Sequence, residues 1–103
     1  MRRWAEKAVD IIVDLYDPDQ IVLFGSSAKG KETTSSDIDM IVVKDTGIRR
    51  AHRGVEVYEA LSRFPVKFDL LFYTHEELKD GLSRPYSFLE SVWKTATCLY
   101  RKT

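Results

Sequence analysis

Two short apolar runs, residues 21–24 and 40–43, most constrain how this chain can fold, because glycine and acidic residues border them. The first run leads directly into the dipeptide Gly25-Ser26, and the second follows the segment 36–39, which reads Ser-Asp-Ile-Asp. Apolar runs of this length that are bounded by turn-forming residues are typical of buried strands. The sequence therefore predicts two buried strands, each with a polar group of residues at one end.

The two aspartates of segment 36–39 are expected to share one face of the second strand. Side chains alternate between the faces of a strand, so Asp37 and Asp39 point the same way. Two carboxylates on one face repel each other unless a cation lies between them, and hard oxygen ligands suit Mg²⁺, particularly when phosphate oxygens complete its shell. The Gly25-Ser26 turn is a suitable place for those phosphates, because glycine allows close approach and exposed N–H groups can face an anion. The pattern indicates a metal–nucleotide site.

The size and charge of the chain exclude several classes of protein. A length of 103 residues predicts one domain, residues 1–103, with a single core. Sixteen basic and sixteen acidic side chains cancel, which argues against general nucleic-acid binding, because that affinity requires excess positive charge. No apolar stretch approaches the ~20 residues that cross a bilayer, and no signal peptide is expected at the N-terminus. The single cysteine, Cys98, is expected to be a small buried hydrophobe in a reducing cytoplasm.

Hydrophobic periodicity predicts an α/β fold in which helices pack against a sheet. The expected elements, in order, are a helix that ends before Pro18, a strand over 20–24, a helical turn over 26–30, a strand over 37–44, a helix over 49–63, a strand over 66–73, a short helix capped by Thr74, a helix after Pro85 and a strand over 97–100. The inward side chains expected from the first two helices are Trp4, Ala8, Ile11, Ile12, Leu15, Ala51, Val55, Tyr58 and Leu61. Spacing does not decide whether the first two strands run parallel or antiparallel.

A third carboxylate, Asp69, lies within the apolar strand predicted over residues 66–73. An ionised side chain is costly to bury there without a partner. If this strand lies beside the strand of the other two aspartates, three carboxylates converge, and such a triad can hold two metal ions for phosphoryl transfer. Asp69 could also take the proton from an attacking hydroxyl. The structural alternative is an ion pair of Asp69 with Lys67 or Arg63.

These segments together resemble a known family. Residues 25–30 read Gly-Ser-Ser-Ala-Lys-Gly, residues 36–40 read Ser-Asp-Ile-Asp-Met, and Asp69 follows in a later strand. This arrangement resembles the minimal nucleotidyltransferases of the DNA polymerase beta-like nucleotidyltransferase superfamily. The order of strands and helices extends the resemblance over nearly the whole chain. The resemblance implies the nucleotidyltransferase fold, a small mixed β-sheet flanked by helices.

The resemblance also implies roles for individual residues. Asp37 and Asp39 would ligate both of two Mg²⁺ ions, and Asp69 would ligate one ion and activate the acceptor hydroxyl. The residues implied to contact the phosphates of ATP or another NTP are Gly25, Ser26, Ser27, Lys29 and Ser36. Many relatives carry arginine in place of this chain's serine 27 and lysine 29, and lysine keeps the charge but lacks the bidentate fork of arginine. The implied reaction transfers a nucleoside monophosphate, AMP from ATP, to a hydroxyl, and pyrophosphate leaves.

The resemblance further implies a protein partner. Family members of this size often lack a domain for the acceptor substrate, and many are antitoxins encoded beside a HEPN-domain toxin. Some are similar to proteins that transfer AMP onto a tyrosine of the partner. The implied partners are therefore ATP or another NTP and a HEPN-type protein. A homodimer is also compatible with the sequence, and no association with a membrane is expected.

Three alternatives stay open at this point. The chain could be a non-catalytic binding module that neutralises its partner by contact alone. Residues 25–31 also resemble a P-loop after a strand, although Glu32 stands where that motif requires serine or threonine. The basic cluster over residues 49–53 could contact a triphosphate, an RNA or an acidic partner, or it could be a solvated face.

Overall fold

The structure is a computed structural model that describes residues 2–25 and 37–102. Its elements, in chain order, are α1 (Arg2–Tyr16), β1 (Gln20–Phe24), β2 (Ile38–Val43), the 3-10 helix η1 (Arg50–His52), α2 (Val55–Leu61), β3 (Phe68–Tyr73), α3 (His75–Ser83), α4 (Phe88–Trp93) and β4 (Thr97–Arg101). The predicted order of helices and strands is confirmed for these elements. The helical turn predicted over residues 26–30 lies outside the described residues.

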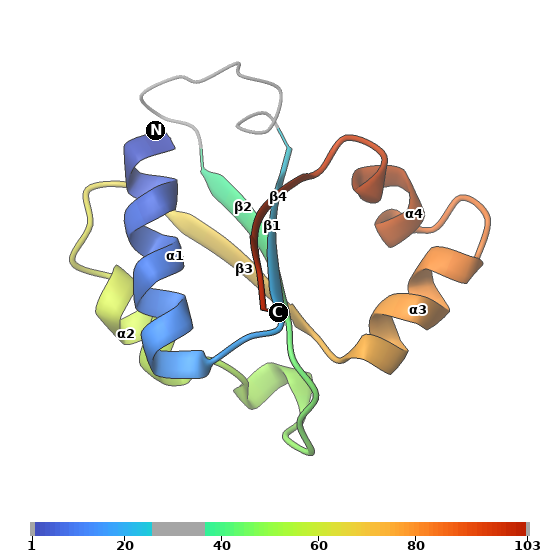
Figure 1. Cartoon of the computed structure of the whole chain (residues 1–103), viewed down its shortest axis with the longest axis horizontal. Coiled ribbons are helices and arrows are strands. Elements are labelled where there is room, and N and C mark those ends of the chain that lie inside the picture. The colour runs from blue at the N-terminus through green and yellow to red at the C-terminus, as the bar shows by residue number, and fades with distance from the viewer. Residues whose placement is uncertain (1, 26–36, 103) are drawn as a thin grey trace.

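The four strands form one mixed sheet in the order β3-β2-β1-β4. Strand β1 is antiparallel to both β2 and β4, whereas β2 and β3 are parallel. The direction that the sequence left open is therefore antiparallel, so that β1 ends and β2 begins at the same end of the sheet (Figure 1). A small mixed sheet with flanking helices is the fold class predicted from the sequence.

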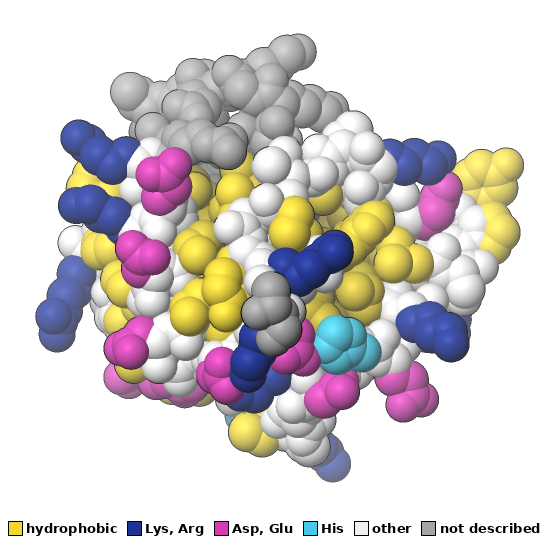
Figure 2. Space-filling model, viewed as in Figure 1, with side chains coloured by type: hydrophobic (Ala, Val, Ile, Leu, Met, Phe, Trp, Pro, Cys, Tyr) yellow, Lys and Arg dark blue, Asp and Glu magenta, His cyan; other side chains and the backbone are white. Residues whose placement is uncertain are grey.

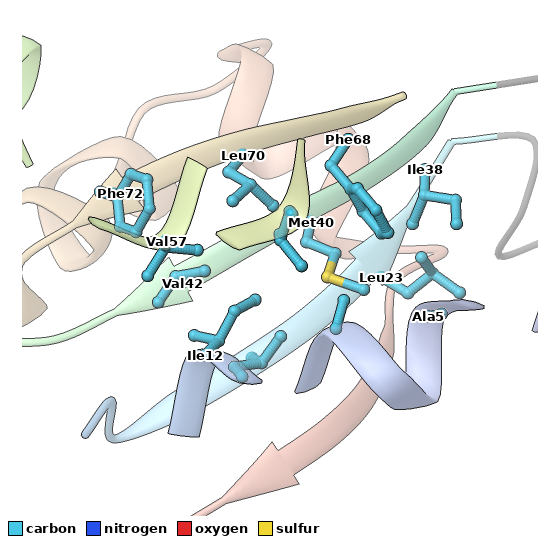
Figure 3. Packing of buried hydrophobic residues seen from close by; sticks show 13 residues of the cluster. Ala5, Ile12, Leu23, Ile38, Met40, Val42, Val57, Phe68, Leu70 and Phe72 are labelled. Atoms are coloured by element: carbon cyan, nitrogen blue, oxygen red, sulfur yellow. The ribbon is translucent and has the colours of Figure 1, made fainter. Parts of the chain in front are cut away.

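Helices cover both faces of this sheet, with α1 and α2 on one face and α3 and α4 on the other (Figure 1). On the α1–α2 face, Ile38, Met40 and Val42 of β2 pack in the larger apolar cluster with side chains of β3 and both helices (Figure 3). The alternate residues of β2, Ile41 and Val43, belong to a smaller cluster beneath α3 and α4. The alternation predicted for this strand is confirmed, and it leaves the aspartates on the α3–α4 face.

The helix predicted over residues 49–63 is interrupted, so its predicted continuity is wrong. Gly54 separates η1 from α2 and has a φ of 73°, in the left-handed region that favours glycine. A Cβ at this position would lie 2.7 Å from Cε1 of the buried Phe72 ring. The break therefore depends on a contact with a strand far along the chain.

Several side chains that were predicted to be buried are exposed: Leu15, Ala51, Val55, Tyr58 and Cys98. Because α2 begins only after Gly54, the buried positions of this helix are Val57 and Leu61. The Tyr58 hydroxyl instead donates a hydrogen bond of 2.8 Å to the Leu70 carbonyl at the edge of the sheet. The cysteine lies on β4, which is an edge strand of the sheet formed by the described residues.

The start of α3 is stabilised by a capping box. The sequence predicted that Thr74 caps this helix, and the prediction is confirmed. The Thr74 hydroxyl accepts from the Glu77 N–H at 3.1 Å, and the Glu77 carboxylate accepts from the Thr74 N–H at 2.9 Å. The same carboxylate also accepts hydrogen bonds from Nη1 and Nη2 of Arg53, at 2.7 and 3.2 Å. This hydrogen bond from Arg53 lowers the pKa of Glu77 to about 2. Arg53 is only 8% exposed, so this member of the predicted basic cluster is a structural residue.

The surface seen in Figure 2 mixes acidic and basic side chains. Apolar side chains are also visible along the middle of this face, between α1 and the α3–α4 pair. In the connection between α3 and α4, Tyr86 is 97% exposed. Within residues 2–25 and 37–102, no helix has both the length and the apolar character needed to cross a membrane.

Candidate active site

The parallel pairing of β2 with β3 brings two of the predicted site residues side by side. Asp39 and Asp69 are register partners in these strands. Residues that pair in register point to the same face, and neighbouring strands lie about 4.8 Å apart. The strands of Asp39 and Asp69 are therefore adjacent, as a convergence of their carboxylates requires.

On its other side, Asp39 contacts the end of β1. Its register partner there is Phe24, and the next residue is Gly25, which has a φ of 79°. A Cβ at Gly25 would lie 2.6 Å from Oδ2 of Asp39. Both the left-handed backbone and this close approach require glycine. The carboxylate therefore lies directly against the backbone at the turn that the sequence predicts for phosphates.

The surroundings of Asp39 disfavour its charged form. Partial burial raises the pKa of Asp39, and the nearby carboxylates of Asp69 and Asp37 raise it further. All three causes act in the same direction, because desolvation and like charges both oppose ionisation. The site therefore concentrates negative charge that a cation would stabilise.

Asp37 precedes the first residue of β2 and lies near a basic side chain of the loop before β3. Oδ2 of Asp37 is 3.9 Å from Nζ of Lys67, whose side chain is 74% exposed. The sequence allows Lys67 to pair with Asp69, but Lys67 forms an ion pair with Asp37 instead. An exposed pair of this kind contributes little to stability.

The residues present fit Mg²⁺ that arrives with a nucleotide. Among the described residues, no three His, Cys, Asp or Glu side chains form a group ready to hold a metal ion. Magnesium, however, is usually bound through one or two carboxylates together with water and substrate phosphates. Asp39 and Asp69 supply two carboxylates on one face, and Gly25 keeps the space beside them free of a side chain.

Phe88, to which the sequence analysis assigns no role, also lies near this site. The Phe24 ring lies on the same face as Asp39 and packs against Phe88 at the start of α4, with ring centroids 5.9 Å apart. The spacing of apolar residues predicts a helix after Pro85 but assigns no role to Phe88. Four predicted site residues, Ser26, Ser27, Lys29 and Ser36, lie outside the described residues.

The charge at this site gives a direct prediction for stability. We expect Asp39→Asn to raise the free energy of unfolding by about 0.5 kcal/mol, because it removes like charge from paired strands, and to raise Tm by about 2–4 °C. Since folding raises the pKa of Asp39, the contribution of Asp39 to stability falls as the pH rises above 3.8. The gain should therefore be largest near neutral pH and shrink as the pH falls towards 3.8.

Thermal denaturation of both proteins without metal or nucleotide, over a series of pH values, measures this effect. Asp10→Asn is the matched control, because Asp10 is an exposed acid on α1. A variant less stable than the wild type at neutral pH would contradict the electrostatic account of the site.

This mixed sheet, with helices on both faces and with Asp39 and Asp69 on adjacent strands, has the nucleotidyltransferase architecture that the sequence resemblance implied. Residues 6–103 match the family model described as Polymerase beta, Nucleotidyltransferase. The chain therefore belongs to the polymerase beta-like nucleotidyltransferase family, as its motifs predicted. No curated protein matches the chain in sequence.

Solved structures share this fold. One is a crystal structure of a Sulfolobus solfataricus protein assigned as a nucleotidyltransferase, with a TM-score of 0.66 and 20% identity over 99% of this chain and 81% of that chain. Another is a crystal structure of a toxin–antitoxin with AMP-PNP, with a TM-score of 0.65 and 22% identity over 95% of this chain and 74% of that chain. The predicted nucleotidyltransferase fold is confirmed by these similarities.

Proposed function

We propose that this chain is an Mg²⁺-dependent nucleotidyltransferase that transfers AMP from ATP to a hydroxyl of a protein partner. The observation that carries the proposal is the pairing of Asp39 with Asp69 on one face, against the backbone of Gly25. The raised pKa of Asp39 supports a site that accepts positive charge. Membership of the family supports the same class of chemistry.

Asp37 and Asp39 would bind Mg²⁺ together with the nucleotide phosphates, which would complete a site that the described side chains do not form alone. Asp69 would be a further ligand and would have a second role. When bound, Mg²⁺ supplies positive charge that stabilises the phosphoryl oxygens. Asp69 takes the proton of the acceptor hydroxyl, whose oxygen forms a bond to the α-phosphorus. The bond from that phosphorus to the bridging oxygen of the β-phosphate breaks, and pyrophosphate leaves.

A protein acceptor suits the architecture. The described residues form one sheet with its helices, and α3 and α4 are the elements that flank the carboxylate face. The toxin–antitoxin structure combines a similar fold with AMP-PNP and a protein partner. We infer the corresponding role here, an antitoxin that modifies a HEPN-type toxin.

The test is transfer of label from ATP to the product of the neighbouring gene in the presence of Mg²⁺. We expect label on the partner with the wild type and with the Asp10→Asn control, and none with Asp37→Asn or Asp39→Asn. Neutralisation of the partner that persists in both site variants, with no label under any condition, would identify a contact-only binding module instead.

A further inference from the structure

Two aromatic side chains, Phe24 and Phe88, lie next to the carboxylates on the same face of the sheet. Phe24 is the register partner of Asp39, so its side chain lies one strand away on the same face. This ring is only 8% exposed. The Phe88 ring packs edge-to-face against it, with centroids 5.9 Å apart and an interplanar angle of 85°. The start of α4 is therefore held beside the carboxylate site.

The position of Phe88 is set by its neighbours in the chain. The Ser87 hydroxyl accepts from the Glu90 N–H at 3.0 Å and donates to the Gly81 carbonyl at 2.6 Å. The following residue, Leu89, is buried against Gly81 of α3. Phe88 nevertheless remains 53% exposed. It is a fixed aromatic side chain with an uncovered surface, on a helix that is anchored on both sides of it.

We propose that the uncovered face of Phe88 binds the nucleobase of the NTP. This inference rests on the proposed function, which puts the phosphates beside Gly25 and the carboxylates of Asp37 and Asp39. From that position, Phe24 lies one strand away, and Phe88 packs against Phe24. A nucleoside monophosphate is long enough to span this distance. Aromatic rings stack on any nucleobase because every base has a π-face. Phe88 therefore supplies affinity for the base without selecting one base by hydrogen bonding.

Titration calorimetry in Mg²⁺ with ATP and with inorganic tripolyphosphate separates the base from the phosphates. We expect Phe88→Ala to weaken ATP binding about tenfold and to leave tripolyphosphate binding unchanged, and we expect Phe88→Trp to restore ATP affinity. Ile48→Ala is the matched control, because Ile48 is also 53% exposed but follows β2 at the opposite end of the sheet. This control should leave both affinities unchanged.

Phe88→Leu separates stacking from packing, because leucine retains an apolar contact with Phe24 but has no aromatic face. Weaker ATP binding with unchanged tripolyphosphate binding in this variant supports the inference. Unchanged ATP affinity in both Phe88→Ala and Phe88→Leu overturns it and leaves the ring as a contact for a protein partner. Equal losses for ATP and tripolyphosphate also overturn it, since Phe88 would then act on the phosphate site. A wild type that binds neither compound refutes the proposed function itself, and this inference with it.

Discussion

The Asp69→Asn variant is expected to lose nucleotidyl transfer about 1,000-fold while it keeps most of its affinity for ATP with Mg²⁺, because a positioned general base contributes about 10²–10⁴ in rate. Asparagine has nearly the shape of aspartate but cannot take the proton of the acceptor hydroxyl. Asp69 is also the more exposed member of its pair with Asp39. We therefore expect an acceptor to approach from the side of Asp69. Single-turnover transfer of label and calorimetric titration of ATP measure the two quantities separately.

The contrast with Asp39 makes this experiment specific. Asp39 lies between Gly25 and Asp69, so Asp39→Asn should weaken ATP binding as well as transfer. Asp10→Asn on α1 should change neither quantity. A transfer rate for Asp69→Asn within about threefold of the wild type, well below the contribution of a general base, would exclude Asp69 from that role.

The Glu77→Ala variant is expected to lower the free energy of unfolding by about 3 kcal/mol, because it leaves a buried charge without its partner and removes the capping box. Arg53 is the residue left behind, and its side chain is 6% exposed. The Glu77 side chain is 33% exposed, which places the effect at the lower end of the range for buried pairs. Urea unfolding measures this loss.

The pH dependence of that loss has a definite sign. Folding lowers the pKa of Glu77 from 4.5 to about 2, so its carboxylate stabilises the protein fully above 4.5 and less as the pH falls towards 2. The difference between wild type and Glu77→Ala should shrink over this range. Glu77→Gln keeps an acceptor for the cap and should lose less than the alanine variant, and Glu76→Ala should change little. A difference that stays constant down to the lowest pH would contradict the role of the ion pair.

Much of this fold could be predicted from local sequence. The strand expected over residues 20–24 has those bounds in the structure, because a short apolar run between turn residues leaves few alternatives. The alternation of β2 was predictable for a similar reason, since a period of two residues assigns each side chain to a face. The cap at Thr74 was also readable, because it depends on residues only three positions apart.

The remaining features depend on contacts between distant parts of the chain. The break at Gly54 coincides with the close approach of this residue to Phe72 of β3, and an isolated glycine in a helical pattern does not by itself establish a break. The pairing of Asp39 with Asp69 was stated as a condition, because the order of strands in a sheet is not a local property. Local sequence does not indicate a role for Phe88, because its partner, Phe24, lies in the first strand.

The unequal apolar clusters on the two sides of the sheet also bear on how such a protein can change over evolutionary time. The α1–α2 side contains the larger cluster, so mutations there endanger folding itself. The opposite side combines a smaller cluster with the carboxylates and the first turn of α4. We therefore expect new substrate preferences to arise by changes in α3 and α4, while the sheet that carries the acidic residues stays packed against α1 and α2.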